Sequence, residues 1–386
     1  MERSWLLAPV ESGPAAGLGI YLHVPFCVHR CGYCDFATWD DADGLIARYV
    51  TAMHASIARG AELVDRPVTS VFVGGGTPTR LAPAELAGLV AAVRARHDIA
   101  ADAEITVECN PDDASDELFA ALRDVGVTRV SIGAQSFQPE LLAFLERTHG
   151  PEGPVRAVEL ARAAAIEHVS LDLLYGTPGE TDDGWVDSLD RAVATGVDHL
   201  SAYALTIHDN TPFGRRVHDG QMLPPDPDVQ RQRFDIARQR LATSGFHAYE
   251  LSNWATGQPA RSRHNLLYWR HGDYLAHGVG AHGHLDGRRW WHHRSIPRFC
   301  EAIESGDDAV AGRESLDDQE RALERLMLGL RLADGIAATD LPLIEQKRLE
   351  QAIEADLVAF DGARLRATDH GWFLLDEVVH VLTGGG

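Results

Sequence analysis

Three cysteines close together near the start of the chain are the residues best suited to chemistry. Cys27, Cys31 and Cys34 follow an apolar alternating run in YLHVPFCVHRCGYCDF, residues 21–36. Thiolates spaced C-x3-C-x2-C can hold three irons of a cuboidal 4Fe-4S cluster, because the short turns between them let the three sulfurs converge. The fourth iron then lacks a protein ligand, so it can bind an exchangeable molecule.

Two other interpretations of these cysteines compete with the cluster. A zinc site usually takes four Cys or His ligands, and His23 and His29 could complete such a set. Alternatively, the three cysteines are small buried side chains with a structural role. Three cysteines within residues 27–34, in a chain that has five, favour the iron-sulfur site.

The phrase YLHVPFCVHRCGYCDF resembles the radical S-adenosylmethionine signature of the oxygen-independent coproporphyrinogen III oxidase family, which includes a haem-chaperone branch. The similarity runs from about Gly19 to about Val381. It implies that S-adenosylmethionine chelates the open iron, and that an electron from the cluster can cleave it to a 5′-deoxyadenosyl radical. In such proteins the cofactor carries the reaction, while the protein positions and shields it.

Strand-like and helical segments alternate through the first part of the chain. The apolar, strand-like runs are residues 19–24, 69–74, 104–109, 128–133, 168–174 and 198–205. The helical patterns between them are residues 43–64, 83–97, 115–124, 154–165 and 182–195. This alternation predicts parallel strands with right-handed crossovers. Six such units are too few for a closed eight-stranded barrel, so we expect an α/β fold with an open, partial (β/α)6 barrel, which the resemblance also implies.

Glycine and polar residues follow the expected strands, where a ligand of such a barrel binds. The glycines of GGGTPT, residues 74–79, let the backbone approach a ligand closely. Glu108 could accept hydrogen bonds from a ligand amine or ribose, and Arg147 could pair with a carboxylate. Taken singly, each polar residue is more often structural. In the family comparison, these residues match S-adenosylmethionine contacts: Tyr21, Tyr33, Gly75, Gly76, Thr77, Glu108, Gln135, Arg147, Asp172 and Ala204.

The phrase HNLLYW, residues 264–269, opens a stretch that is rich in histidine. Histidine can ligate haem iron, and Tyr268 and Trp269 could form an apolar wall for a porphyrin. From chemistry alone, packing on the open side of the barrel is the better interpretation. H-N-x-x-Y-W is similar to a motif of the haem-chaperone branch, however, and the resemblance makes His264 the expected haem ligand. The other histidines of the stretch include His271, His277, His282, His284, His292 and His293.

The regular alternation ends after Leu205, and the rest of the chain divides into further parts. The expected domains are an N-terminal extension (1–18), the partial barrel (19–245), a connecting segment with HNLLYW (246–314) and a C-terminal domain (315–386). We expect a helix up to about Ser244 and one more edge strand in YELSNWA, residues 249–255. The glycine-rich stretch 278–284 is expected to close over the bound nucleotide. The C-terminal part resembles a winged-helix α+β module, with helical patterns at 317–332, 342–359 and 371–382 and a hairpin turn at Asp361-Gly362.

Composition limits the classes of partner. A net charge of -22 argues against a phosphate-binding face, so we expect no nucleic acid partner. Lys347 is the single lysine, which excludes a Walker-type loop and a Schiff-base lysine in the barrel. No run has the length of a transmembrane span and the N-terminus lacks a signal-peptide core, so a cytoplasmic location is expected, which also suits reduced thiolates.

Two functions within the family remain, and Phe36 helps to separate them. The family's decarboxylases carry another cysteine two residues after the third cluster ligand, whereas the chaperone branch has phenylalanine there, as this chain does. The segment before Tyr21 is also shorter than the N-terminal extension of the decarboxylases. We therefore expect a haem chaperone whose partners are haem, an acceptor protein and an electron donor for the cluster. The alternatives are an oxygen-independent coproporphyrinogen III oxidase and a related radical methyltransferase; the catalytic residues of either stay unassigned.

Overall fold

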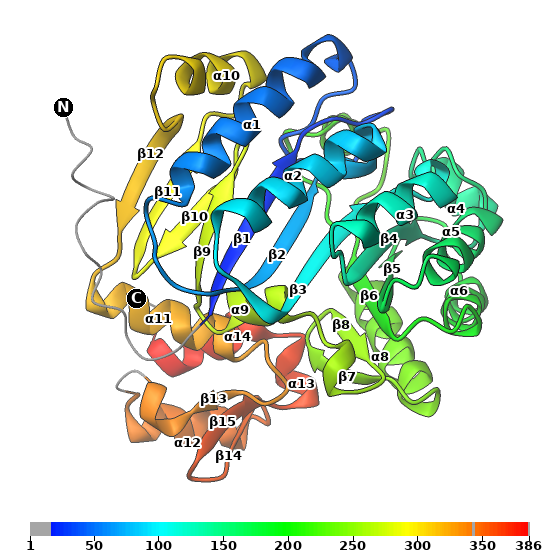
Figure 1. Ribbon diagram of the computed structural model, residues 1–386. Coiled ribbons are helices and arrows are strands. Elements are labelled where there is room, and N and C mark those ends of the chain that lie inside the picture. The colour runs from blue at the N-terminus through cyan, green and yellow to red at the C-terminus, as the bar shows by residue number, and fades with distance from the viewer. Residues whose placement is uncertain (1–16, 342–343, 385–386) are drawn as a thin grey trace.

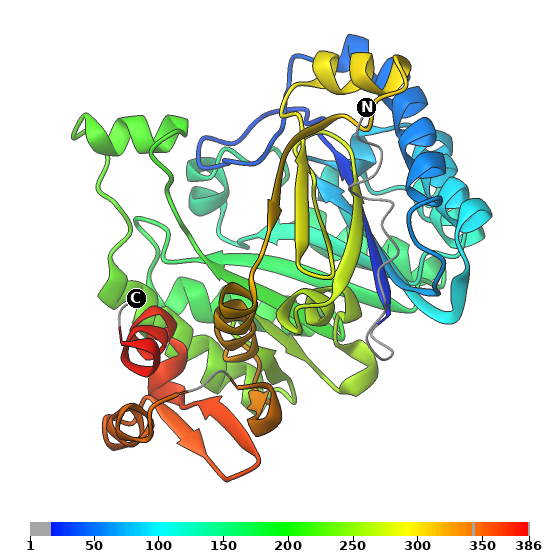
Figure 2. The same cartoon turned by 90° about the vertical axis from the view of Figure 1, so that its left-hand side faces the viewer.

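The computed structural model describes residues 17–341 and 344–384, and its central feature is one long, twisted sheet (Figures 1 and 2). Six neighbouring strands of this sheet are parallel and follow the order of the chain. They are β1 (Leu18–Val24), β2 (Val68–Gly75), β3 (Ile99–Cys109), β4 (Arg129–Gln135), β5 (His168–Tyr175) and β6 (His199–Ala204). These strands confirm the predicted repeats and the partial barrel. The expected N-terminal extension lies, up to residue 16, outside the described residues.

Helices connect the parallel strands and cover one face of the sheet, where α1, α2 and α3 lie side by side (Figure 1). Apolar residues at helical spacing make this packing possible: α1 buries Tyr49, Met53 and Ile57 along one stripe. The crossover helices are α1 (Ile46–Gly60), α2 (Pro83–Arg96), α3 (Asp116–Asp124), α5 (Glu152–Ala163) and α6 (Asp182–Ala194). A short helix that the pattern did not predict, α4 (Pro139–Phe144), follows β4.

Residues 246–314, expected as a connecting segment, instead extend the sheet at both edges. β8 pairs with β6 at one edge and β9 pairs in parallel with β1 at the other. This pairing satisfies backbone groups that the two outer barrel strands would otherwise expose. The added strands are β7 (His247–Glu250), β8 (Asn253–Ala255), β9 (Asp273–His277), β10 (His282–Leu285), β11 (Arg288–His292) and β12 (Val310–Ser315). The single strand expected at 249–255 is thus wrong, because a turn at residues 251–252 divides it into an antiparallel pair.

The C-terminal unit has its own small core and its own sheet, in the order β13-β15-β14. Leu326, Leu365 and Val378 are fully buried there. The predicted hairpin is confirmed, because Gly362 has φ +86 and Asp361 Oδ1 accepts hydrogen bonds from the two backbone N–H groups that follow the turn. The elements are α11 (Asp318–Gly329), β13 (Ile336–Ala337), α12 (Gln346–Glu354), β14 (Val358–Phe360), β15 (Arg364–Ala367), α13 (Asp369–Trp372) and α14 (Leu375–Thr383).

Two of the predicted C-terminal helices are shorter than expected. The pattern at 342–359 begins on residues outside the described part, and its end is strand β14 rather than helix. The last predicted helix is divided into α13 and α14.

The remaining α-helices of the described part are α7 (Pro212–His218), α8 (Pro227–Thr243), α9 (Arg263–Trp269) and α10 (Ile296–Glu304). Of these, α7 packs on the cysteine loop, where the N–H of Phe213 donates to the carbonyl of Gly32 at 2.8 Å. Short 3-10 turns also occur at η1 (Asp43–Leu45), η2 (Pro78–Arg80), η3 (Pro111–Asp113), η4 (Gln258–Ala260) and η5 (Ala338–Asp340). The end of α8 confirms the helix expected up to about Ser244. In the part of the chain that the structure describes, no helix is both long and apolar enough to cross a bilayer.

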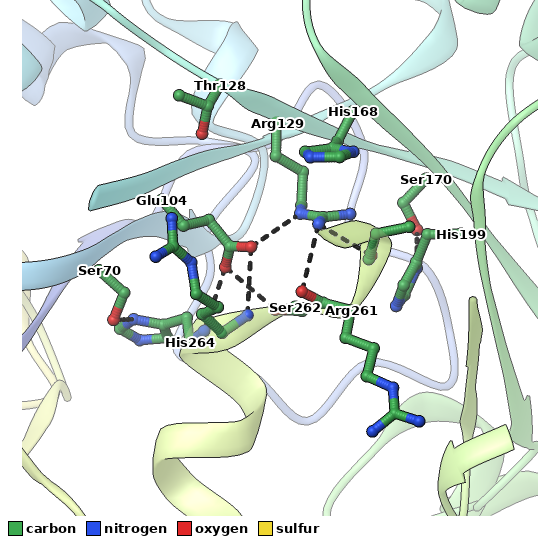
Figure 3. A network of polar contacts seen from close by, with 12 residues as sticks. Ser70, Glu104, Thr128, Arg129, His168, Ser170, His199, Arg261, Ser262 and His264 are labelled. Atoms are coloured by element: carbon green, nitrogen blue, oxygen red, sulfur yellow. Dashed lines mark hydrogen bonds and ion pairs between the residues drawn. The ribbon is translucent and has the colours of Figure 1, made fainter. Parts of the chain in front are cut away.

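A buried ion pair joins strands β3 and β4 to the start of α9 (Figure 3). Arg129 Nε donates to Glu104 Oε2 at 3.1 Å, and the two side chains are 2% and 4% exposed. Glu104 also accepts hydrogen bonds from the backbone N–H groups of Arg263 and His264, each at 3.1 Å, and so caps the helix. Arg129 Nη2 donates to the carbonyl oxygen of Ala260 at 2.9 Å. The ion pair therefore positions the HNLLYW helix against the barrel.

We expect Glu104→Ala to lower the free energy of unfolding by about 3–5 kcal/mol, because Arg129 would remain buried without its counter-charge. Urea denaturation of the cluster-free protein measures the change. Arg48→Ala removes an exposed pair with Glu304 and should alter stability little. Equal losses from the two variants would contradict a supporting role for the buried pair.

Candidate functional site

The carboxyl ends of the parallel strands meet around a cleft of about 480 Å³. Parallel strands end at the same edge of a sheet, so residues far apart in the chain converge there. Most of the predicted site residues line this cleft. They are Cys27, Cys31, Tyr33, Cys34, Gly75, Gly76, Thr77, Glu108, Gln135, Arg147 and Asp172.

The cysteine loop follows β1 and is held by its own backbone. The N–H of Cys27 donates to the carbonyl of Trp39 at 3.0 Å, and the N–H of Cys34 donates to the carbonyl of Cys31 at 3.0 Å. Arg30 Nη2 donates to the carbonyl of Cys34 at 3.3 Å, which ties the loop to itself. The three cysteines form no disulfide and face the same cleft.

Each cysteine sulfur has a polar neighbour. Thr77 Oγ1 donates to Cys27 Sγ at 3.6 Å, and Arg147 Nη1 donates to Cys31 Sγ at 3.7 Å. Cys34 Sγ lies 3.9 Å from the hydroxyl oxygen of Thr38. Donors of this kind stabilise thiolates, and hydrogen bonds to sulfur also tune an iron-sulfur cluster. The donor set therefore fits a cluster held by three thiolates.

The zinc alternative does not fit this arrangement. Both ring nitrogens of His23 are used, because Nδ1 accepts from the hydroxyl of Tyr21 and Nε2 donates to the carbonyl of Ala37, each at 2.9 Å. His29 Nε2 lies 3.2 Å from a carboxylate oxygen of Glu146. Across the described ranges, no three His, Cys, Asp or Glu side chains are grouped closely enough to hold one metal ion. A cluster has no such need, because each cysteine binds a different iron.

Glycine is required at the end of β2 because neighbouring side chains lie too close to the backbone there to leave room for a Cβ. Gly75 has φ +118, and a Cβ there would lie 2.6 Å from the ring of His23. A Cβ on Gly76 would lie 3.0 Å from Cys27 Sγ. The N–H of Gly76 donates to the carbonyl of Val24 at 2.8 Å, so the glycine stretch is fastened to the strand that leads into the cysteine loop.

Two carboxyl groups share the wall of the cleft, and none of the ion pairs among the described residues includes either of them. Glu108 accepts a hydrogen bond from the N–H of Gly75 at 3.0 Å, and Ser131 Oγ donates to Asp172 at 2.9 Å. Burial raises the pKa of Glu108 to about 8, the charge of Asp172 adds to the rise, and the Gly75 hydrogen bond opposes it. Burial also raises the pKa of Asp172. A ligand with positive charge would stabilise both carboxylates.

Arg147 and Gln135 complete the polar wall. Arg147 Nη2 donates to Asn110 Oδ1 at 3.3 Å and to the carbonyl of Gly133 at 3.4 Å. Burial has the largest single effect on the pKa of Arg147 and lowers it. The negative charges that Tyr33 and Cys31 carry when ionised outweigh this effect and raise the pKa, so the guanidinium stays cationic. Gln135 has φ +61, an uncommon conformation for a residue other than glycine, at the end of β4. Strained backbone of this kind gathers at ligand sites.

Two predicted contacts do not line the cleft. Tyr21 lies behind Phe72, with ring centroids 6.2 Å apart, and it is Phe72 that faces the cleft. Ala204 packs against the apolar core, while its neighbour Tyr203 lines the cleft.

Several further residues line the cleft that the sequence motifs do not indicate. They include Phe72, Thr106, Arg129, Ser131, Ser170, His199, Ser201 and Tyr203. A signal for them was present, because they occur two residues apart within apolar strands, and alternate residues of a strand face the same side. Polar residues in phase with Glu108 and Asp172 therefore indicate the inner face.

The structure corrects the expectation for His264, which is fully buried and does not line the cleft. Figure 3 shows it beside Ser70, at the start of α9. Its Nδ1 lies 2.9 Å from Ser70 Oγ, and its Nε2 lies 2.8 Å from the hydroxyl of Tyr268. Burial lowers its pKa to about 4, so the imidazole is neutral. With both ring nitrogens hydrogen-bonded, His264 has no lone pair free for haem iron. Tyr268 and Trp269 line a different cavity.

The chain matches two family models. Residues 21–192 match the Radical SAM superfamily, and residues 316–374 match the HemN C-terminal domain. The second match covers most of the α+β unit that follows the extended sheet.

Curated relatives and a solved structure match over most of the chain. The heme chaperone HemW of Mycobacterium tuberculosis is 42% identical over 98% of this chain and 97% of its own length. HemW of Synechocystis is 35% identical, covering 89% and 85%, and HemW of Escherichia coli is 38% identical, covering 70% and 72%. The coproporphyrinogen III oxidase HemN of Escherichia coli has a similar fold, with a TM-score of 0.82, 21% identity and coverage of 95% and 90%.

Replacing Cys27, Cys31 or Cys34 by Ala should remove nearly all of the cluster absorbance after anaerobic reconstitution, because a 4Fe-4S cluster with two protein thiolates is poorly held. Cys300→Ala is the matched control, since Cys300 is buried in α10 away from the cleft. A full cluster in any one of the three loop variants would overturn the assignment.

Glu108→Gln should change how stability depends on pH. An acid whose pKa is raised by folding loses stability as pH rises from the unfolded value, near 4.5, through the folded value of about 8. As the pH rises from 5 to 8.5, the free energy of unfolding of the wild type should therefore fall relative to that of the variant, by at most roughly 3–5 kcal/mol. Urea denaturation of the cluster-free protein tests this, with exposed Glu117→Gln as control. Parallel pH curves for Glu108→Gln and the wild type would show that Glu108 is not perturbed.

Proposed function

The chain belongs to the HemW family of radical S-adenosylmethionine proteins, and from this premise we propose that it is a haem chaperone. It binds haem, carries a 4Fe-4S cluster with exchangeable S-adenosylmethionine, and passes haem to an acceptor protein. The relation to the HemW proteins extends over almost the whole chain, which supports a shared function rather than a shared domain.

The cleft supports the proposed cofactors. Cys27, Cys31 and Cys34 would hold three irons, and the fourth iron would supply the reductive chemistry of the cluster to bound S-adenosylmethionine. Gly75, Gly76 and Thr77 would lie along the methionine end, where the absence of side chains at the glycines lets the backbone approach. Glu108 and Asp172 would face the cationic parts of the ligand, and Arg147 would pair with its carboxylate. Tyr33 and Gln135 would contact the ligand directly, whereas Tyr21 would support Phe72 from behind.

Phe36 is the observation that favours the chaperone over the decarboxylase. It lines the cleft and is 60% exposed, which is unusual for a phenylalanine. The family's decarboxylases have a thiol at this position, and phenylalanine offers no group that could exchange a proton or a hydrogen atom with a substrate. The fold shared with HemN does not separate the two functions, because one fold supports several activities.

The proposed activity belongs to the haem supply that follows porphyrin biosynthesis, and we place it in the cytoplasm. Reduced thiolates and an oxygen-sensitive cluster persist in a reducing compartment. An external electron donor would reduce the cluster.

Anaerobic assays of the reconstituted protein test the proposal. We expect one haem bound per chain, transfer of that haem to an apo-haemoprotein, and no protoporphyrinogen when coproporphyrinogen III, S-adenosylmethionine and a reductant are supplied. HemN from Escherichia coli serves as the positive control for turnover. Formation of protoporphyrinogen would show that the chain is a decarboxylase. Failure to bind haem would overturn the proposal that it is a haem chaperone.

A further inference from the structure

A second cavity, of about 580 Å³, lies between the antiparallel strands β10–β12 and the helices α9 and α11. Its walls are mostly aromatic and histidine side chains. They include Tyr268, Trp269, Tyr274, His282, Arg289 and Trp291. Large pockets with apolar walls and a few polar groups are typical of small-molecule sites.

His282 is the histidine of this cavity that is free to bind a ligand. Its side chain is exposed and, within residues 17–341 and 344–384, makes no hydrogen bond and no ion pair. Its ring stacks on Trp291, its partner across the strands, with centroids 5.8 Å apart and planes at 25°. His284 is engaged at both ring nitrogens, by the carbonyl of Gly272 at 3.0 Å and the N–H of Gly287 at 3.1 Å.

The other groups near the cavity are also engaged. His271 Nε2 lies 3.3 Å from Glu324 Oε2, and Arg289 pairs with Glu314 and Glu324. The ring of Trp291 lies over Gly312 of the next strand, where a Cβ would approach the ring to 2.2 Å. The absence of a side chain at Gly312 therefore leaves Trp291 as a flat wall.

A row of rings separates this cavity from the cleft. Phe72 stacks on His264 at 5.3 Å, His264 meets the edge of Tyr268 at 4.8 Å, and Tyr268 meets Tyr274 at 4.6 Å. Phe72 lines the cleft, and Tyr268 and Tyr274 line the second cavity. The buried HNLLYW histidine is thus part of the partition between the two spaces.

We propose that the second cavity is the haem site and that His282 is an axial ligand of the haem iron. This inference rests on the proposed function, because it names where a haem chaperone of this structure would hold its cargo. Trp291 and the tyrosines would offer the porphyrin apolar contacts, and its charged carboxylates would stay at the open, hydrated side.

Titration of the full-length, cluster-loaded protein with ferric haem under anaerobic conditions tests the site. The readouts are haem affinity and the magnetic circular dichroism and EPR signals of the haem iron. His282→Ala should weaken haem binding by about tenfold or more and remove the signature of histidine ligation. His282→Met should retain binding with the signature of a thioether ligand, which a merely structural role would not produce.

His247→Ala is the matched control, because His247 is an exposed histidine on β7 at the other edge of the sheet. The cluster absorbance reports that each variant is folded. Unchanged affinity and spectra in both His282 variants would overturn the site while leaving the chaperone function in place. No haem binding by the wild type would instead overturn the proposed function itself.

Discussion

Six parallel strands end at one edge of the sheet, and this constraint decides where the polar groups of the chain can meet. The cysteine loop follows β1, the glycine stretch follows β2, and Glu108 and Asp172 stand near the ends of β3 and β5. Side chains two residues apart face the same side of a strand, so each strand contributes further polar groups to the same cleft. The hydrogen bond from Gly75 to Glu108 then connects two neighbouring strand ends directly.

The strands that follow the barrel give the molecule a second space of different chemistry. The first cleft holds thiols, glycines and carboxyl groups, whereas the second cavity is lined by tryptophan, tyrosine and histidine. The ion pair between Glu104 and Arg129 fixes α9 against the barrel, and α9 carries two of the rings that stand between the two spaces, His264 and Tyr268. In the proposed function, this partition lets one chain bind S-adenosylmethionine in the cleft and haem in the second cavity, so that the two ligands do not contact each other.

The barrel and the cleft could be predicted from the sequence because their signals are local. Apolar runs mark the six strands, and the spacing of Cys27, Cys31 and Cys34 indicates the cluster without knowledge of the fold. The strands β9 to β12 could not be predicted, because they are short and their residues, such as His282 and Trp291, lack an apolar alternation. Their place beside β1 depends on pairing across the whole length of the chain.

The position of His264 shows a second limit of reading motifs. HNLLYW contains residue types that can bind haem, yet both ring nitrogens of His264 are already hydrogen-bonded, one with Ser70 and one with Tyr268, and the sequence does not reveal that Ser70 lies nearby. Burial of a histidine depends on tertiary packing, and only the structure separates the engaged His264 from the free His282.

The most direct test of the central claim is the EPR spectrum of the reduced cluster with and without S-adenosylmethionine labelled with ¹⁷O in its carboxylate. If three cysteines leave one iron open to this cleft, S-adenosylmethionine should shift the g values and the label should produce a hyperfine coupling to the cluster. A spectrum that is identical with and without the labelled molecule would mean that the open iron does not bind it, and would contradict the account of the cleft.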